Sequence, residues 1–269
     1  MRRLTALLLC LLLLPCAVLS EQPDGAEDRD GQIIYEDVML DGDDAGENGA
    51  EETEPRERTA RDDFLDRIIE QGRELWTKAG GKPQRAHYKG DIYVCKNFTT
   101  YLFRQNRDDF RMAEYPDVTL VIPDNLPKDK CKPYAYGLAW IDVPASKGNP
   151  FYAAAEFRYN SKLSKEENMA LAMDFLRQAQ RGDFFQMTGN YGSGSGAHSA
   201  ILLGYDPQTD EIHWMDSNMS GKRIKGIRYG YVQFDTVKSV EWWAGKFCQR
   251  KCGATIYRLR DDIVYAAGK

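Results

Sequence analysis

Apolar side chains recur at helical spacing in three parts of the chain. In residues 60–79 they fall on one face of a helix, which a pair of glycines beginning at Gly80 then stops. The residues on this face are Phe64, Leu65, Ile68, Ile69, Leu75 and Trp76. The same spacing predicts a second helix that begins close to Cys95, and a third over residues 168–180 behind a capping box at residues 164–167.

Short apolar segments bounded by turn-forming residues predict strands in the rest of the chain. The strand candidates are residues 118–122, 136–143, 152–159, 184–188, 199–204, 211–216, 229–234 and 254–259. Residues 237–247 show no clear preference for helix or strand. Because the first elements are helices and most later ones are consecutive strands, the pattern predicts an α+β fold with N-terminal helices packed on an antiparallel sheet.

The strands at residues 199–204 and 211–216 are separated by turn residues, which is typical of a hairpin. Pairing would bring His198, just before the first strand, beside Asp216 and Asn218 at the end of the second. Asp216 and Asn218 would share a face because strand side chains alternate. An imidazole facing an acid and an amide is typical of a catalytic base with its orienting groups, although an Asp-Ser-Asn sequence is also ordinary turn chemistry.

Cys95 is the candidate nucleophile. A thiol attacks acyl carbon atoms as a thiolate, and a helix N-terminus beside an imidazolium favours that form. His198 would act as the base and later protonate the leaving amine, while the backbone N–H of Cys95 would stabilise an oxyanion. The alternatives are a buried, unreactive thiol at Cys95 and a hydrogen-bonded residue at the end of a sheet at His198.

The N-terminal part of the sequence reads as two segments that precede the folded domain. Residues 1–20 carry two arginines and then an apolar run too short to span a bilayer, which predicts a secretory signal peptide cleaved after Ser20. Cys16 raises the alternative of a lipoprotein. The mature protein is therefore expected to be secreted or otherwise extracytoplasmic, at the cell wall, with no integral membrane segment.

Charge is distributed unevenly along the 269 residues. Residues 21–59 hold 15 acidic residues against three arginines and few apolar ones, which predicts an acidic disordered linker. Residues 60–269, the expected single domain, carry 31 basic and 26 acidic residues, a net charge of +5. A mildly basic exported domain suits anionic wall polymers, and an ordinary surface beside a solubilising linker explains the same balance.

Several other classes of site are excluded or disfavoured by the sequence. The glycine-rich loop at residues 192–196 lacks the Lys-Ser/Thr of a phosphate-binding loop, and the chain has no basic stripe, so neither a nucleotide site nor nucleic-acid binding is expected. The spacing of Cys248 and Cys252 has no matching second pair, so we expect no metal, and no cofactor. If Cys95 is free, at most one disulfide can form among Cys131, Cys248 and Cys252.

Two further groups of residues are expected to be structural. His87 lies in a polar connecting segment, and His213 alternates with Asp216 along the second strand of the hairpin. Four tryptophans fit a core or a cleft wall better than a sugar-binding platform: Trp140, Trp214, Trp242 and Trp243.

The order of a cysteine opening a helix, a histidine strand and an acid-x-Asn sequence resembles the papain-like cysteine hydrolases of the CHAP and NlpC type. The matching residues are Cys95 in CKNFTTYLF, GDFF at residues 182–185, His198 in AHSAILLGYD, and Asp216-Ser217-Asn218. They cover roughly residues 88–104 and 181–218. The chain departs from the CHAP pattern in having Asp where Glu is more frequent, and its segment between Cys95 and Gly182 is longer than in compact members.

The resemblance implies a papain-like domain at residues 60–269 with an insertion at about residues 107–163. It implies that Cys95 is the nucleophile, His198 the base, Asp216 the orienting acid and Asn218 a further polar member. The implied function is that of an exported cysteine peptidase or amidase acting on peptidoglycan peptides. The alternatives are an inactive binding module with the same fold, and an acyltransferase or protease acting on extracellular proteins. The sequence does not determine the oligomeric state.

Overall fold

The computed structural model describes residues 57–86, 92–122, 140, 143–187, 197–219 and 225–268. The expected signal peptide, all of the expected acidic linker before residue 57, the glycine-rich loop at 192–196, His87 and Cys131 lie outside these residues. Of the strand predicted at residues 136–143, only Trp140 and Val143 are described, and neither lies in a strand.

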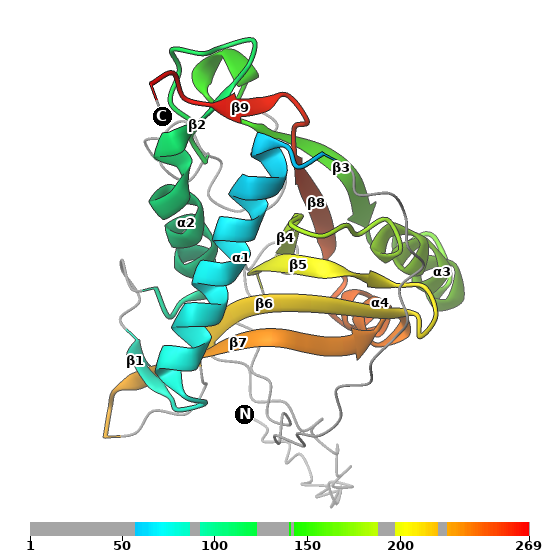
Figure 1. Ribbon diagram of the computed structural model, residues 1–269. Coiled ribbons are helices and arrows are strands. Elements are labelled where there is room, and N and C mark those ends of the chain that lie inside the picture. The colour runs from blue at the N-terminus through cyan, green and yellow to red at the C-terminus, as the bar shows by residue number, and fades with distance from the viewer. Residues whose placement is uncertain are drawn as a thin grey trace, which may run out of the picture.

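An antiparallel sheet of seven strands forms the centre of the protein (Figure 1). Its strand order is β1-β7-β6-β5-β4-β8-β3. The strands are β1 (Gln84–Ala86), β3 (Phe151–Arg158), β4 (Phe184–Met187), β5 (His198–Asp206), β6 (Glu211–Met219), β7 (Arg228–Ser239) and β8 (Gly253–Leu259). The predicted hairpin is β5–β6, and its register pairs Ile201 with Met215.

Four α-helices accompany the sheet in the described part of the chain: α1 (Ala60–Ala79), α2 (Cys95–Asn106), α3 (Lys165–Leu176) and α4 (Val240–Arg250). Local caps define several of their ends. Thr59 and Asp62 form a capping box before α1, which ends at Gly80 in the left-handed conformation. The predicted capping box at Ser164 and Glu167 is present at the start of α3. The undecided segment at residues 237–247 divides into the end of β7 and most of α4.

The sheet separates two hydrophobic cores because consecutive strand residues point to opposite faces. Phe184, Ile201 and Met215 belong to the core that includes the buried face of α1 and α2. The neighbouring residues Phe185 and Leu202 belong to the core that includes α3 and α4. Helices therefore cover both faces of the sheet, and the α+β class expected from the sequence is confirmed.

A smaller two-stranded sheet pairs β2 (Phe110–Met112) with β9 (Ile263–Tyr265), next to the 3-10 turn η1 (Arg107–Asp109).

The prediction of a strand at residues 118–122 is wrong. That segment is irregular, and its buried Leu120 and Ile122 join the core while the backbone N–H of Val121 bonds to the carbonyl of Gly148. Gly148 caps another 3-10 turn, η4 (Ala145–Lys147). The apolar residues of this segment alternate because they are buried. A β-strand would also need a neighbouring strand with which to form a ladder of hydrogen bonds.

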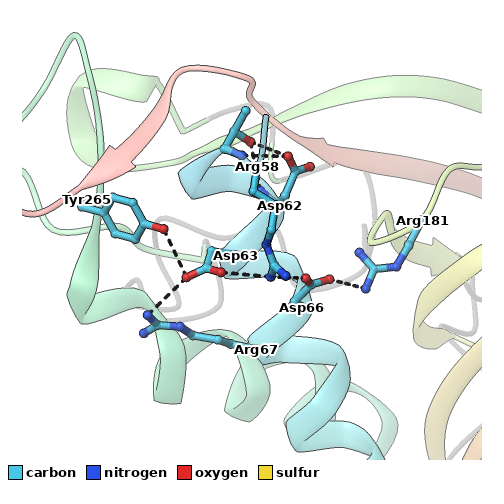
Figure 2. A network of polar contacts seen from close by, with 8 residues as sticks. Arg58, Asp62, Asp63, Asp66, Arg67, Arg181 and Tyr265 are labelled. Atoms are coloured by element: carbon cyan, nitrogen blue, oxygen red, sulfur yellow. Dashed lines mark hydrogen bonds and ion pairs between the residues drawn. The ribbon is translucent and has the colours of Figure 1, made fainter. Parts of the chain in front are cut away.

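Ion pairs connect α1 to segments that are distant in sequence (Figure 2). Asp66 accepts hydrogen bonds from Arg58 and Arg181, and Asp63 accepts from Arg67 and from the Tyr265 hydroxyl at 3.2 Å. These contacts are largely exposed, so each contributes at most about 1 kcal/mol. None of the helices in the described part of the chain has the length and hydrophobicity needed to span a bilayer.

Candidate active site

Cys95 is the first residue of α2. The preceding residue, Val94, has extended backbone angles and makes no side-chain cap, and the first turn contains no acidic residue. The first N–H groups of an α-helix have no acceptor within the helix, and they carry the positive end of its dipole. Cys95, a residue that is 5% exposed, therefore has its thiol where a developing negative charge is favoured.

A close backbone contact places the start of α2 over the sheet. Gly230 of β7 lies directly beneath the carbonyl group of Tyr93, and a β-carbon at Gly230 would be 2.3 Å from that oxygen. Such a separation is far below van der Waals contact, so only glycine is compatible with this packing. Gly230 pairs with Met219 of β6, three residues after Asp216. The contact thus holds the turn before Cys95 close to the end of the predicted hairpin.

His198 and Asp216 lie together on neighbouring strands. His198 opens β5, and its Nε2–H donates to Asp216 Oδ2 across 2.6 Å. Both side chains are buried, with exposed fractions of 1% and 0%. The same carboxylate oxygen accepts a second hydrogen bond, from Trp214 Nε1 at 3.1 Å. The hairpin predicted from the sequence has therefore brought the histidine and the acid into direct contact.

The Cys95 side chain is close enough to the His198 ring to interact with it electrostatically. Because Nε2 already faces Asp216, Nδ1 is the ring nitrogen that could take a proton from the thiol. The structure thus joins three side chains from distant parts of the chain in the order thiol, imidazole and carboxylate. This is the arrangement in which a base with an orienting acid activates a nucleophile.

The surroundings of His198 change its proton affinity. Burial opposes the charged imidazolium and is the largest single influence, but the hydrogen bond and the negative charge of Asp216, together with Cys95, outweigh it. The net result is a raised pKa for His198. The imidazole is therefore suited to hold a proton taken from the thiol while it remains paired with the carboxylate.

Asn218 lies two residues beyond Asp216 on β6 and is also buried, at 6% exposure. Extending the β5–β6 register from Ile201 and Met215 would place Asn218 level with His198. The carboxylate hydrogen-bonded to the imidazole belongs to Asp216, and its role as the orienting acid stays a prediction. A role for Asn218 as a further polar member of the site stays a prediction.

Sequence reasoning missed the contact of Trp214 with Asp216, because it assigned this tryptophan only to the core or a cleft wall. The two residues are two positions apart on β6, and that spacing places them on one face of a strand.

Sequence reasoning also found no role for Asp183, the acid of the GDFF segment. Asp183 is buried and receives two hydrogen bonds of 2.8 Å from Arg258, so this acid joins β8 to the turn before β4.

The other reactive side chains lie away from this site. Cys248 and Cys252, near the end of α4, are both free, and burial raises the pKa of Cys252 to about 12. His213, three residues before Asp216 on β6, hydrogen-bonds through Nδ1 to the exposed Asp235 at 2.7 Å. Within the ranges that the structure describes, no three His, Cys, Asp or Glu residues are grouped as metal ligands would be.

Some hollows on the described surface are not lined by Cys95. One of about 390 Å³ lies between α1 and the exposed ends of β5, β6 and β7, and it contains the His213–Asp235 pair. Arginines and carboxylates of nearly equal number line it, including Arg73, Arg181 and Asp206. This balance gives no preference for a charged ligand.

Comparison with known proteins adds no family to these observations. No family model, no curated protein and no solved structure matches the chain.

Proposed function

We propose that the protein is an exported cysteine hydrolase that cleaves amide bonds through an acyl-thioester on Cys95. The observation that carries the proposal is the contact sequence from Cys95 to His198 to Asp216, in which a helix-terminal thiol meets a buried imidazole held by a carboxylate. A buried small cysteine with a purely structural role does not need a histidine partner of raised pKa beside it. The combination therefore favours nucleophilic chemistry.

In the proposed reaction the sulfur of Cys95 attacks the carbonyl carbon of an amide after its proton has passed to His198. The negative charge that develops on the carbonyl oxygen would be stabilised by backbone N–H groups at the start of α2. His198 then gives its proton to the leaving amine, and the C–N bond breaks to leave a thioester on Cys95. A water molecule, deprotonated by His198, hydrolyses the thioester and releases the acid and the thiol. Asp216 keeps the ring oriented throughout.

For the substrate, we propose peptidoglycan peptides. The resemblance to CHAP and NlpC-type hydrolases supports this class, as do the expected signal peptide and the net charge of +5 over residues 60–269. A positively charged domain would be attracted to an anionic wall polymer, and that attraction would weaken as salt increases. The proposed location is extracytoplasmic.

The decisive test incubates purified protein with muropeptides and reads the products by mass spectrometry. The Cys95→Ala variant should lose all measurable cleavage, whereas Cys252→Ala, which removes another buried free thiol, should keep the parental rate once its folding has been verified by circular dichroism. Cleavage by Cys95→Ala at the parental rate would show that the thiol is not the nucleophile.

Two additions to this test separate the alternatives. Supplying an amine acceptor would reveal acyl transfer as an amide product in place of the free acid. Labelling with iodoacetamide at pH 6 would reveal an inactive binding module, because Cys95 would then react no faster than a model thiol. A hydrolase should instead show fast labelling that His198→Gln abolishes.

A further inference from the structure

We infer that Trp214 is a positioning residue of the site, which fixes the carboxylate of Asp216 so that one oxygen serves His198. This inference rests on the proposed function of the Cys95, His198 and Asp216 contact. Trp214 Nε1 donates to Asp216 Oδ2 at 3.1 Å, and Oδ2 is also the acceptor for His198 Nε2. The indole therefore adds a fourth side chain to the series of interacting residues that begins at the thiol.

The rest of the Asp216 carboxylate explains why a second donor on Oδ2 matters. The other oxygen, Oδ1, is buried and has no hydrogen-bond partner among the residues that the structure describes. Rotation about the last torsion of an aspartate is only weakly restricted, so a single hydrogen bond would not decide which oxygen faces the ring. Two N–H donors converging on Oδ2 hold the carboxylate plane in one orientation.

The indole is itself held rigidly. Trp214 is 1% exposed and packs edge-to-face against Trp243 of α4, with ring centroids 5.0 Å apart and an interplanar angle of 69°. The β6–β7 register shifts between Trp214 and Asp216, because β7 inserts an additional residue there. Such a bulge changes the local twist and redirects side chains, and it occurs here at the point where Trp214 must reach Asp216.

The hydrogen bond also has an electrostatic consequence. A donor to a carboxylate disperses its negative charge and so reduces its attraction for the neighbouring imidazolium. Without the indole N–H, Asp216 would bind the imidazolium proton more strongly, and His198 would lose this proton only at a higher pH. Trp214 thus affects both the orientation of the base and the pH at which it deprotonates.

The chain provides a matched control for this inference. Trp243 is as buried as Trp214, belongs to the same core and touches it directly, but its Nε1 has no hydrogen-bond partner within the described residues. Trp214→Phe and Trp243→Phe therefore remove the same atoms from adjacent positions in one core. Only the first substitution removes a hydrogen bond to Asp216.

The experiment measures two quantities in the parent and in both variants. Steady-state cleavage should show kcat reduced about 10- to 100-fold in Trp214→Phe with KM unchanged, the scale expected for a hydrogen bond to a charged group, and kcat within about twofold in Trp243→Phe. The imidazole titration of His198, followed by NMR of ¹⁵N-histidine-labelled protein between pH 6 and 11, should move to higher pH in Trp214→Phe alone. His198→Gln would assign the resonance.

Each result distinguishes this inference from the proposed function. An unchanged kcat and an unchanged titration in Trp214→Phe would overturn the positioning role, and so would equal effects in Trp243→Phe, which would indicate core packing. The titration does not depend on turnover. A shift confined to Trp214→Phe in a protein that cleaves no amide would support the positioning role and contradict the hydrolase proposal.

Discussion

Strand β6 takes part in two histidine–aspartate pairs that have nearly the same length and opposite surroundings. Asp216 meets His198 of β5 at 2.6 Å, and His213 meets Asp235 of β7 at 2.7 Å. The side chains of the first pair are 1% and 0% exposed, and those of the second are 32% and 56% exposed. A distance criterion alone would rank the two pairs as equal.

The two pairs differ in their exposure to solvent, and a third side chain, the thiol of Cys95, lies beside the buried pair. Water screens the exposed pair, which limits its net contribution to about 0–1 kcal/mol. The buried pair is not screened, so Asp216 acts on the protonation of His198 at full strength, and the Cys95 thiol is present to exchange a proton with the ring. The presence of a histidine–aspartate ion pair therefore does not distinguish a candidate catalytic pair from a surface contact. The distinguishing features are that the pair is buried and that a candidate nucleophile lies beside it.

The largest expected effect comes from removing the charge of each aspartate in turn. Asp216→Asn should lower kcat/KM on the order of 10³-fold, because the histidine loses the carboxylate that fixes its tautomer. Asp235→Asn, the matched change in the exposed pair, should leave kcat/KM within about twofold, because surface substitutions have small effects. Steady-state kinetics on muropeptides would check both, and similar losses in the two variants would contradict the distinction drawn between the pairs.

The next effect is the dependence of stability on pH. The pKa of His198 in the folded state is raised above its value in the unfolded state, which is about 6.5. The contribution of His198 to the free energy of unfolding is therefore complete below the unfolded-state pKa and is lost as pH rises toward the folded-state pKa. The difference in unfolding free energy between the parent and His198→Gln should therefore shrink by at most about 1.4 kcal/mol per pH unit above neutrality. Urea denaturation at several pH values would measure it, and a difference that grows with pH would have the wrong sign.

A third change tests the backbone contact that delivers the thiol to the buried pair. Gly230→Ala should displace the turn at Tyr93, with a loss of about 1–3 kcal/mol of stability and of at least tenfold in kcat/KM. Gly245→Ala in α4 is the control, since its added β-carbon would touch nothing and should stabilise the helix by about 0.5–1 kcal/mol. Thermal unfolding and kinetics would be compared, and normal turnover in Gly230→Ala would show that Cys95 is placed by other contacts.

The smallest effect concerns the exposed pair. His213→Gln should change the free energy of unfolding by less than about 1 kcal/mol, and this difference should decrease further between 0.05 and 0.5 M salt because exposed charges are screened. Urea denaturation at the two salt concentrations would check it. A larger loss that does not depend on salt would show that His213 has a structural role comparable to that of His198.

Features with a local cause were predictable from the sequence. Helix α1 has the bounds expected for it because Thr59 and Gly80 cap it, and α3 begins at its expected capping box. The hairpin was predictable because its turn residues lie between two alternating apolar segments. The three-residue strands β1, β2 and β9 were not predicted, since three residues carry too little periodicity to stand out from a loop.

Residue types and their order along the chain thus determined which side chains could form a nucleophilic site: Cys95 at a helix start, and His198 and Asp216 at the end of one hairpin. Only the tertiary structure decided that the thiol meets the imidazole, because α2 is positioned by a backbone contact at Gly230, more than 130 residues away in sequence. It also decided that one histidine–aspartate pair is buried and the other exposed. Burial depends on what packs around a residue, and strand alternation fixes only the face on which a residue lies.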